Sequence, residues 1–206
     1  MLTFPQFDPV ALAIGPISIH WYGVMYIIAF CGAWALASYR GKKIPGHWNA
    51  EQISDLVFYG ALGAVLGGRV GSVFFYSFDR FLDDPIWLFR VWEGGMSFHG
   101  GLIGVLIAFY FYSKTIGKGF WETIDFIAPF VPFGLGAGRL GNFIGGELWG
   151  RPTDAVWGMV FPHVDNLARH PSQLYQVALE GIAPVSYTHL RAHETRHDLV
   201  CRLLLE

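Results

Sequence analysis

Arg139 is the residue with the clearest capacity for chemistry, because it stands inside an apolar stretch. An ionisable residue is expensive in such a segment, so its presence indicates a function. Its guanidinium offers a planar fork of donors that suits a phosphate, and the neighbouring glycines leave room for a bulky head group. Asn142 lies on the same face if the segment is helical. The pattern predicts a site for a lipid phosphate; the alternative is a structural ion pair, for example with Glu147.

Two other motifs match known sites by spacing alone. Gly136–Gly141 reads G-x-G-x-x-G, but a dinucleotide site needs a preceding strand, and the preceding run contains Pro129 and Pro132. We therefore expect no nicotinamide or flavin site. His193–His197 reads H-E-x-x-H, which on a helix could hold zinc with Glu194 as the base. This segment is too polar for an intramembrane metalloprotease, so no metal site is expected.

The composition indicates a membrane protein. Of the 206 residues, 53% are hydrophobic and only 15% are charged, whereas a soluble domain has about 25% charged residues. A net charge of -2 gives no electrostatic footprint for nucleic acid. Cys31 and Cys201 do not suggest a disulfide framework. These figures exclude a disordered chain and a secreted disulfide scaffold, and they argue against a cytosolic enzyme.

Apolar stretches recur along the chain, separated by short polar connections. They cover residues 17–39, 56–78, 94–113 and 126–146, and a fifth begins near residue 172 and loses its character after residue 185. A helix needs about 20 apolar residues to cross a bilayer. Only Arg69 interrupts the second stretch, and only Arg139 the fourth. We predict an all-α fold, a polytopic bundle of transmembrane helices.

The polar connections predict an orientation through their Lys and Arg content. Basic residues are concentrated in loops 40–55 and 114–125, which we therefore expect in the cytoplasm. The N-terminus and loops 79–93 and 139–171 then lie outside. On this topology His20, His99 and Arg139 gather toward the outer membrane face.

Glycines recur every four residues in three of the apolar stretches. Such ridges let helix backbones approach closely in lipid, so we expect tight helix packing at these positions. They are Gly63, Gly67, Gly71, Gly100, Gly104, Gly134 and Gly138.

Four segments resemble one enzyme family, the phosphatidylglycerol–prolipoprotein diacylglyceryl transferases. The resemblance extends from near the N-terminus to about residue 185. The segments are HWYGVMY (20–26), GGMSFHGGLIG (94–104), DFIAPFVPFGLGAGRLGNFIGGELWGR (125–151) and RHPSQLY (169–175).

The resemblance implies a multi-pass enzyme of the bacterial plasma (inner) membrane, with its active site toward the periplasm. Such enzymes move the diacylglyceryl group of phosphatidylglycerol onto the lipobox cysteine of a prolipoprotein and release glycerol phosphate, the first step of lipoprotein maturation. No metal or organic cofactor is implied, and the implied partners are phosphatidylglycerol and prolipoprotein precursors in the bilayer. By motif, Arg139 matches the family's head-group arginine. Other positions associated with activity are Tyr22, His99, Asn142, Glu147 and Gly150.

The residue types suit that chemistry. A thiolate is the nucleophile, and His99 is a candidate base, since an imidazole titrates near neutral pH; the alternative is a hydrogen-bonded structural histidine. Arg139 would stabilise the departing phosphate. Tyr22 and Asn142 could orient the head group, and Glu147 is expected to orient Arg139 or Asn142 rather than to attack.

The chain departs from the family pattern at three places. Gly145 stands where the family commonly has asparagine, and Gln176 where it often has glutamate. The segment 186–206 is abruptly more polar than what precedes it. We therefore interpret residues 1–185 as an incomplete membrane transferase domain and residues 186–206 as a tail outside the native fold. The chain of 206 residues is then expected to be inactive or nearly so.

Two other functions remain as alternatives at this stage. The first is a membrane protein that binds lipid without catalysis. The second, less favoured, is the intramembrane metalloprotease suggested by His193–His197.

Overall fold

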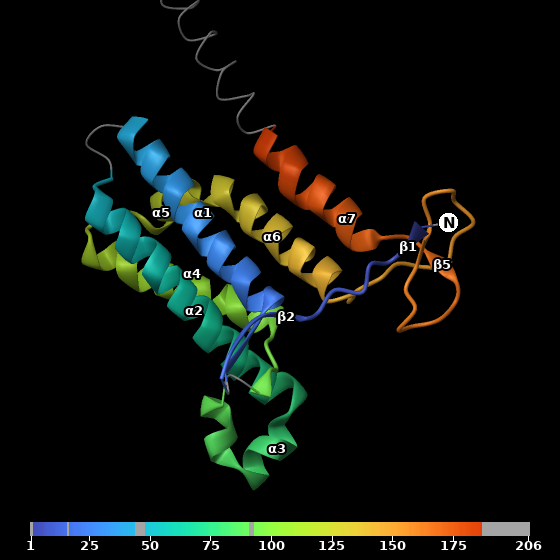
Figure 1. Cartoon of the computed structure of the whole chain (residues 1–206). Helices are drawn as coiled ribbons and strands as arrows, with labels where there is room; N and C mark the ends of the chain where they lie inside the picture. The colour runs from blue at the N-terminus through green and yellow to red at the C-terminus, as the bar shows by residue number, and fades with distance from the viewer. Residues whose placement is uncertain (1, 16, 44–47, 91–92, 187–206) are drawn as a thin grey trace, which may run out of the picture. The chain divides into compact units, whose positions relative to one another are not determined.

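The computed structural model is mostly helical and describes residues 2–15, 17–43, 48–90 and 93–186 (Figure 1). The chain divides into two compact units, each described by itself. Unit 1 comprises residues 1–33 and 128–206, and unit 2 comprises residues 34–127. Apart from residue 186, the tail 186–206 and its H-E-x-x-H motif lie outside the described residues.

Two helices of the described part are long and apolar enough to cross a membrane. They are α1 (Trp21–Lys43) and α2 (Ala50–Tyr76). Helix α1 ends in a basic turn, and α2 begins at a capping box in which Asn49 and Gln52 satisfy each other's backbone donors. The helices agree with the predicted all-α class.

Unit 2 is built on the packing of α2 against α4 (Phe98–Thr115). Its shorter elements are α3 (Phe78–Asp83), η1 (Pro85–Phe89) and α5 (Phe120–Ile127). They form the connections on either side of α4.

Glycines form the contact between α2 and α4. A Cβ added at Gly63 would lie 2.6 Å from the carbonyl oxygen of Gly104, and one at Gly71 would lie 2.7 Å from the Cα of Gly100. A Cβ at Gly67 would overlap the Gly100 carbonyl. The two backbones therefore touch, which confirms the predicted tight packing of these two ridges.

Arg69, the charge inside the second apolar stretch, is buried with only 2% of its surface exposed. Its guanidinium donates to the carbonyl oxygens of Trp87, Leu88 and Gly94. The guanidinium carbon also lies 4.3 Å from the ring centre of Trp87. Arg69 thus fixes the connection between α2 and α4, because its side chain donates hydrogen bonds to backbone carbonyls of that connection and stacks on Trp87.

Unit 1 contains all the described strands, and one of them corrects a sequence expectation. β2 (Val10–Ile14) pairs antiparallel with β3 (Ile17–His20), and a second sheet has the order β1 (Leu2–Thr3), β4 (Met159–Val160), β5 (Ala168–Arg169). The first apolar stretch was expected to be helical from residue 17. The hairpin instead takes residues 17–20, so His20 ends a strand and the helix begins at Trp21.

The apolar stretch 126–146 is not one continuous helix. α5 ends at Ile127, the 3-10 segment η3 covers Ala128–Phe130, and α6 covers Val131–Ile144. Pro129 and Pro132 explain the break, because proline lacks the N–H that an α-helix interior needs and is tolerated only near a helix start.

The rest of unit 1 follows α6 along the chain. After the loop that carries β4 and β5, α7 (Ser172–Gln176) continues into the π-helix η4 (Val177–Ile182). The helix formed by α7 and η4 lies beside α6 (Figure 1). A small apolar core of Phe4, Met159 and Phe161 anchors the loop.

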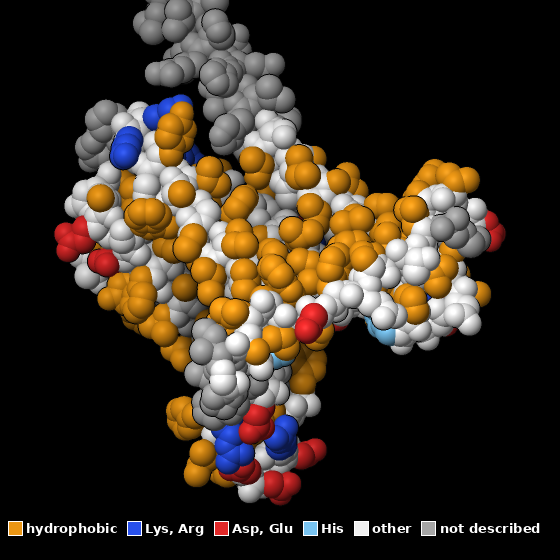
Figure 2. Space-filling model, viewed as in Figure 1, with side chains coloured by type: hydrophobic (Ala, Val, Ile, Leu, Met, Phe, Trp, Pro, Cys, Tyr) orange, Lys and Arg blue, Asp and Glu red, His pale blue; other side chains and the backbone are white. Residues whose placement is uncertain are grey.

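The helices present apolar side chains to their surroundings. Phe75 is 72% exposed on α2 and Phe111 is 65% exposed on α4. Figure 2 shows hydrophobic side chains over most of the viewed face, with charged side chains around α3 and at the end of α1. Large apolar helix faces of this kind suit a lipid environment.

Candidate functional site

Helix α6 carries two of the predicted site residues, Arg139 and Asn142, one turn apart. Asn142 is buried, whereas the Arg139 side chain is 29% exposed. The G-x-G-x-x-G segment lies inside this helix and follows the 3-10 segment η3.

Arg139 forms an ion pair with Glu180 of η4, not with Glu147. Its Nε atom lies 3.1 Å from Oε2 of Glu180. The suggested pairing with Glu147 is therefore wrong, because the packing of η4 beside α6 brings a different carboxylate to the guanidinium. Within the described residues this is the hydrogen bond that Arg139 makes, which leaves its Nη1 and Nη2 donors available.

A tight turn after α6 brings Glu147 back to Asn142. The Glu147 N–H donates to the Asn142 carbonyl at 2.9 Å, and Nδ2 of Asn142 lies 3.5 Å from Oε2 of Glu147. Gly146 has φ +66° and Leu148 has φ +55°. A leucine in this left-handed region is strained by about 1–3 kcal/mol, and such strain tends to be retained where it serves a site.

Two side chains of helix α7 hold this turn by hydrogen bonds to its backbone carbonyls. Gln173 is fully buried and donates through Nε2 to the carbonyl of Glu147, and the Ser172 hydroxyl donates to the Leu148 carbonyl at 2.6 Å. The Oε1 atom of Gln173 has no hydrogen-bond partner among the described residues. The turn that holds Glu147 is therefore fixed by the R-H-P-S-Q-L-Y segment.

Gly150 lies where the loop backbone passes against His170. The Gly150 N–H donates to the His170 carbonyl at 2.9 Å, and a Cβ at Gly150 would lie 2.7 Å from that oxygen. Glycine is thus required for packing at this position. Arg169 donates to the Gly150 carbonyl at 3.3 Å and to the Asp165 carboxylate, and this hydrogen bonding holds the pKa of Asp165 below its ordinary value.

Tyr22 lies in the first turn of α1, close to α6. Its ring lies beside Gly141, where an added Cβ would be 3.3 Å from Cδ2 of Tyr22. Its hydroxyl lies 3.3 Å from that of Tyr26. Unit 1 therefore brings Tyr22 beside α6, the helix that carries Arg139 and Asn142.

His99 belongs to unit 2, as the second residue of α4. Ser97 caps this helix by accepting the Gly100 N–H at 3.2 Å. The imidazole is exposed, and it makes an edge contact with the Phe98 ring. It has no hydrogen-bond partner within the described part of the chain, unlike a histidine held for structural reasons.

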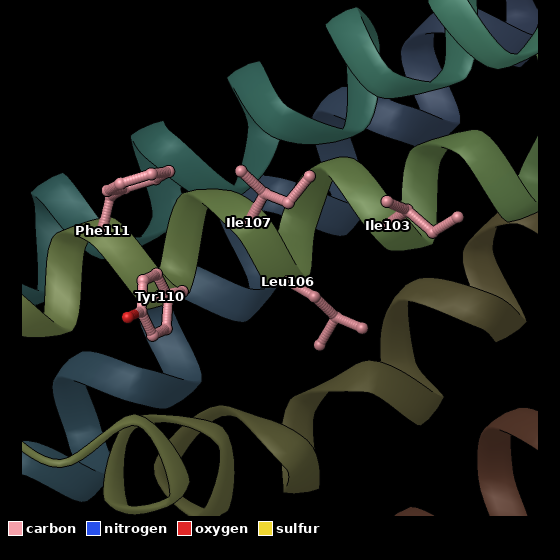
Figure 3. Close-up of a pocket in the computed structure, with 5 residues that line it drawn as sticks. All are labelled: Ile103, Leu106, Ile107, Tyr110 and Phe111. Carbon is pink, nitrogen blue, oxygen red and sulfur yellow. The ribbon is translucent and has the colours of Figure 1, made fainter.

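A hollow of about 460 Å³ on α4 is not a head-group site. It is lined by Ile103, Leu106, Ile107, Tyr110 and Phe111 of one helix face (Figure 3). This lining suits hydrocarbon rather than a charged ligand. Among the residues that the structure describes, no three His, Cys, Asp or Glu side chains gather in a group that could hold a metal.

Sequence reasoning assigned no role to Glu180 and Gln173. Glu180 stands in the fifth apolar stretch, and Gln173 belongs to the R-H-P-S-Q-L-Y segment. The cost of a carboxylate in an apolar stretch was the signal that could have identified Glu180.

A family model described as prolipoprotein diacylglyceryl transferase matches residues 9–203. Three relatives that are similar in sequence to this chain carry the name phosphatidylglycerol–prolipoprotein diacylglyceryl transferase. One from Marinomonas sp. (strain MWYL1) is 60% identical over 184 residues, which cover 89% of this chain and 68% of the relative. One from Pseudomonas aeruginosa (strain LESB58) is 60% identical over 183 residues, covering 89% and 69%.

A third relative, from Legionella pneumophila (strain Paris), is 54% identical over 206 residues, covering 100% of this chain and 80% of the relative. This match and that of the family model extend into residues 186–206.

Proposed function

The chain belongs to the prolipoprotein diacylglyceryl transferase family, and we propose that it moves the diacylglyceryl group of phosphatidylglycerol onto the lipobox cysteine of a prolipoprotein. The cysteine sulfur forms a thioether bond to the glyceryl carbon. The bond from that carbon to the phosphate oxygen breaks, and glycerol phosphate leaves with the electron pair. The thiol proton passes to a base, because the thiolate is the nucleophile.

The observation that carries this proposal is that the Arg139 guanidinium is held at one edge and has two donors left for a ligand. Its guanidinium is held at Nε by Glu180, and Nη1 and Nη2 make no hydrogen bond to any described residue. The Arg139 side chain is 29% exposed. Two parallel N–H donors match two oxygens of a phosphodiester. The same contact strengthens as negative charge develops on the departing phosphate, which lowers the barrier to transfer.

The other residues of unit 1 complete a polar site for the head group. The Asn142 amide and the Tyr22 hydroxyl supply hydrogen bonds to the glycerol or phosphate oxygens. Glu147 accepts from Asn142 at 3.5 Å and so orients the amide rather than attacking the lipid. Gly150 keeps the loop against His170, which maintains the turn beside the site.

His99 is the proposed acceptor of the thiol proton. An imidazole is basic enough near neutral pH to take that proton. Its exposure and its lack of a hydrogen-bond partner among the described residues favour this role over that of a structural histidine. Its assignment to the same reaction depends on the F-H-G-G sequence block, since His99 belongs to unit 2.

We place this activity in a multi-pass helical bundle of the bacterial inner membrane, with the site toward the periplasm. Two spanning-length helices and the exposed apolar faces support the membrane location. The basic residues at the end of α1 and in loop 114–125 support a cytoplasmic location for those segments.

Cysteine labelling of intact cells tests this orientation. In a background lacking Cys31 and Cys201, we expect Asp83→Cys to react with an impermeant maleimide, because loop 79–93 would face the periplasm. Lys42→Cys should react only after permeabilisation. Protection at residue 83 together with labelling at residue 42 would invert the topology.

A transfer assay tests the reaction on two purified proteins. One is the chain of 206 residues, and the other is a fusion that joins residues 1–185 to the C-terminal part of the Marinomonas relative. We expect the fusion to release glycerol phosphate from phosphatidylglycerol only with a lipobox peptide, and not with its Cys→Ser version. Because segment 186–206 is abruptly more polar than what precedes it, we expect the chain of 206 residues to be much less active than the fusion.

The outcomes separate the proposals. Phosphatidylglycerol binding without release in both proteins would favour the non-catalytic lipid-binding alternative. Equal activity of the two proteins would leave the transferase proposal intact and contradict the proposed boundary at residue 185.

A further inference from the structure

We propose that Glu180 is a positioning residue for the head-group arginine. It holds Arg139 at the Nε edge and so directs the Nη1 and Nη2 pair to the phosphate. This inference rests on the proposed function and extends it to a residue with no assigned role.

The contact itself has the geometry that such a role requires. A guanidinium has donors along its Nε side and at its Nη1–Nη2 end, all in one plane. The carboxylate oxygen of Glu180 lies 3.1 Å from Nε. This bond restricts rotation of the guanidinium plane, and the end with two donors stays free for a bidentate contact.

The backbone around the pair is built to allow this contact. A Cβ at Gly181 would lie 2.9 Å from the Cα of Gly136, so the two backbones touch there. Gly136 stands one turn before Arg139 on α6, and Gly181 follows Glu180 directly. The close approach of these glycines brings the Glu180 carboxylate within reach of the arginine.

The local helix type provides a second, independent observation. Residues 177–182 form a π-helix, a rare conformation that appears mostly as single turns and frequently at functional sites. The added residue per turn changes which side chains face the neighbouring helix. Here the π-helical turn contains the one residue that pairs with Arg139 in the described structure.

The exposure of the pair also suits a ligand site. A carboxylate within an apolar stretch is costly to insert, and pairing with Arg139 offsets that cost. The two side chains are 29% and 37% exposed, so the pair is not sealed within the helix packing. A ligand can therefore reach the guanidinium while Glu180 holds it.

The test measures phosphatidylglycerol binding by the full chain, purified in detergent and titrated under native mass spectrometry. We expect Glu180→Ala to weaken binding by about tenfold, the effect of losing one charge-assisted hydrogen bond. Glu180→Gln should recover most of the affinity, because its carboxamide oxygen still accepts from Nε. Leu179→Ala is the matched control, since Leu179 is 71% exposed on the same turn, and it should bind as the parent chain does.

A double substitution separates orientation from a general structural effect. Lysine at position 139 has no Nε donor of this kind, so Glu180→Ala should add less than about twofold in the Arg139→Lys background. The same tenfold loss in that background would overturn the inference. Tighter binding by Glu180→Ala would also overturn it, by making Glu180 a competitor of the phosphate.

The Arg139→Ala variant distinguishes this inference from the proposed function. Parent-like affinity in Arg139→Ala would contradict the phosphate-anchor role itself. Affinity lost in Arg139→Ala but unchanged in Glu180→Ala would contradict the positioning role alone.

Discussion

Replacing Arg139 with alanine is expected to lower the rate of diacylglyceryl transfer by 100-fold or more. Removing one donor that stabilises developing charge typically costs on the order of 100- to 1000-fold in rate. Arg139 would supply two such donors, Nη1 and Nη2, from a guanidinium already held by Glu180. The measurement is steady-state release of glycerol phosphate from the active fusion protein, with phosphatidylglycerol and a lipobox peptide.

Arg139→Lys is expected to restore little of this activity. Lysine keeps the positive charge as a compact ammonium group, but it loses both the planar fork and the Nε contact with Glu180. Arg80→Ala is the matched control, because the Arg80 side chain is 56% exposed and its ion pair with Glu93 lies at the surface of unit 2. If both Arg139 variants folded and turned over at near-normal rates, Arg139 would not be the phosphate anchor.

Replacing Gly104 with alanine is expected to destabilise the protein by at least about 2 kcal/mol. A new Cβ would lie 2.9 Å from the Cα of Gly67 and would overlap the carbonyl of Gly63. Both obstacles are backbone, so α2 and α4 would have to separate, which puts the cost at about 3 kcal/mol or more, the upper end of the usual range for overpacking. The better helix propensity of alanine returns only about 1 kcal/mol, so the clash should dominate.

Gly138→Ala is the matched control for this experiment. Gly138 is also a helical glycine in a four-residue ridge, but nothing lies within 4 Å of its added Cβ. Thermal unfolding in detergent should therefore show a large loss for Gly104→Ala and no loss for Gly138→Ala. Equal stability of the two variants would mean that α2 and α4 do not meet at these glycines.

The local features of the fold were largely predictable. Apolar stretches located the helices, and the ridge spacing of Gly63, Gly67 and Gly104 predicted the close packing that the structure has between α2 and α4. The predicted helix boundaries were wrong at two places, where strand pairing or proline overrides the apolar pattern. Residues 17–20 join a hairpin with β2, and the prolines of the fourth stretch divide it into α5, η3 and α6.

Part of the candidate site was also predictable. The three-residue spacing of Arg139 and Asn142 placed both on one helix face, and the structure confirms that placement. Pairings between distant segments were not predictable. The sequence offered Glu147 as an example of an ion-pair partner for Arg139, whereas the packing of η4 supplies Glu180 from 41 residues away.

The amino-acid sequence by itself determined the family and the mostly helical class, and it indicated a membrane protein with candidate phosphate-binding residues on α6. These depend on composition, on short motifs and on periods along one helix, which do not require knowledge of distant contacts. Only the tertiary structure decided that Glu180 holds Arg139, that Gln173 fixes the turn of Glu147 and that Arg69 closes a loop. The physical reason is that each of these contacts joins segments 18 or more residues apart, and their meeting is set by how the helices and loops pack.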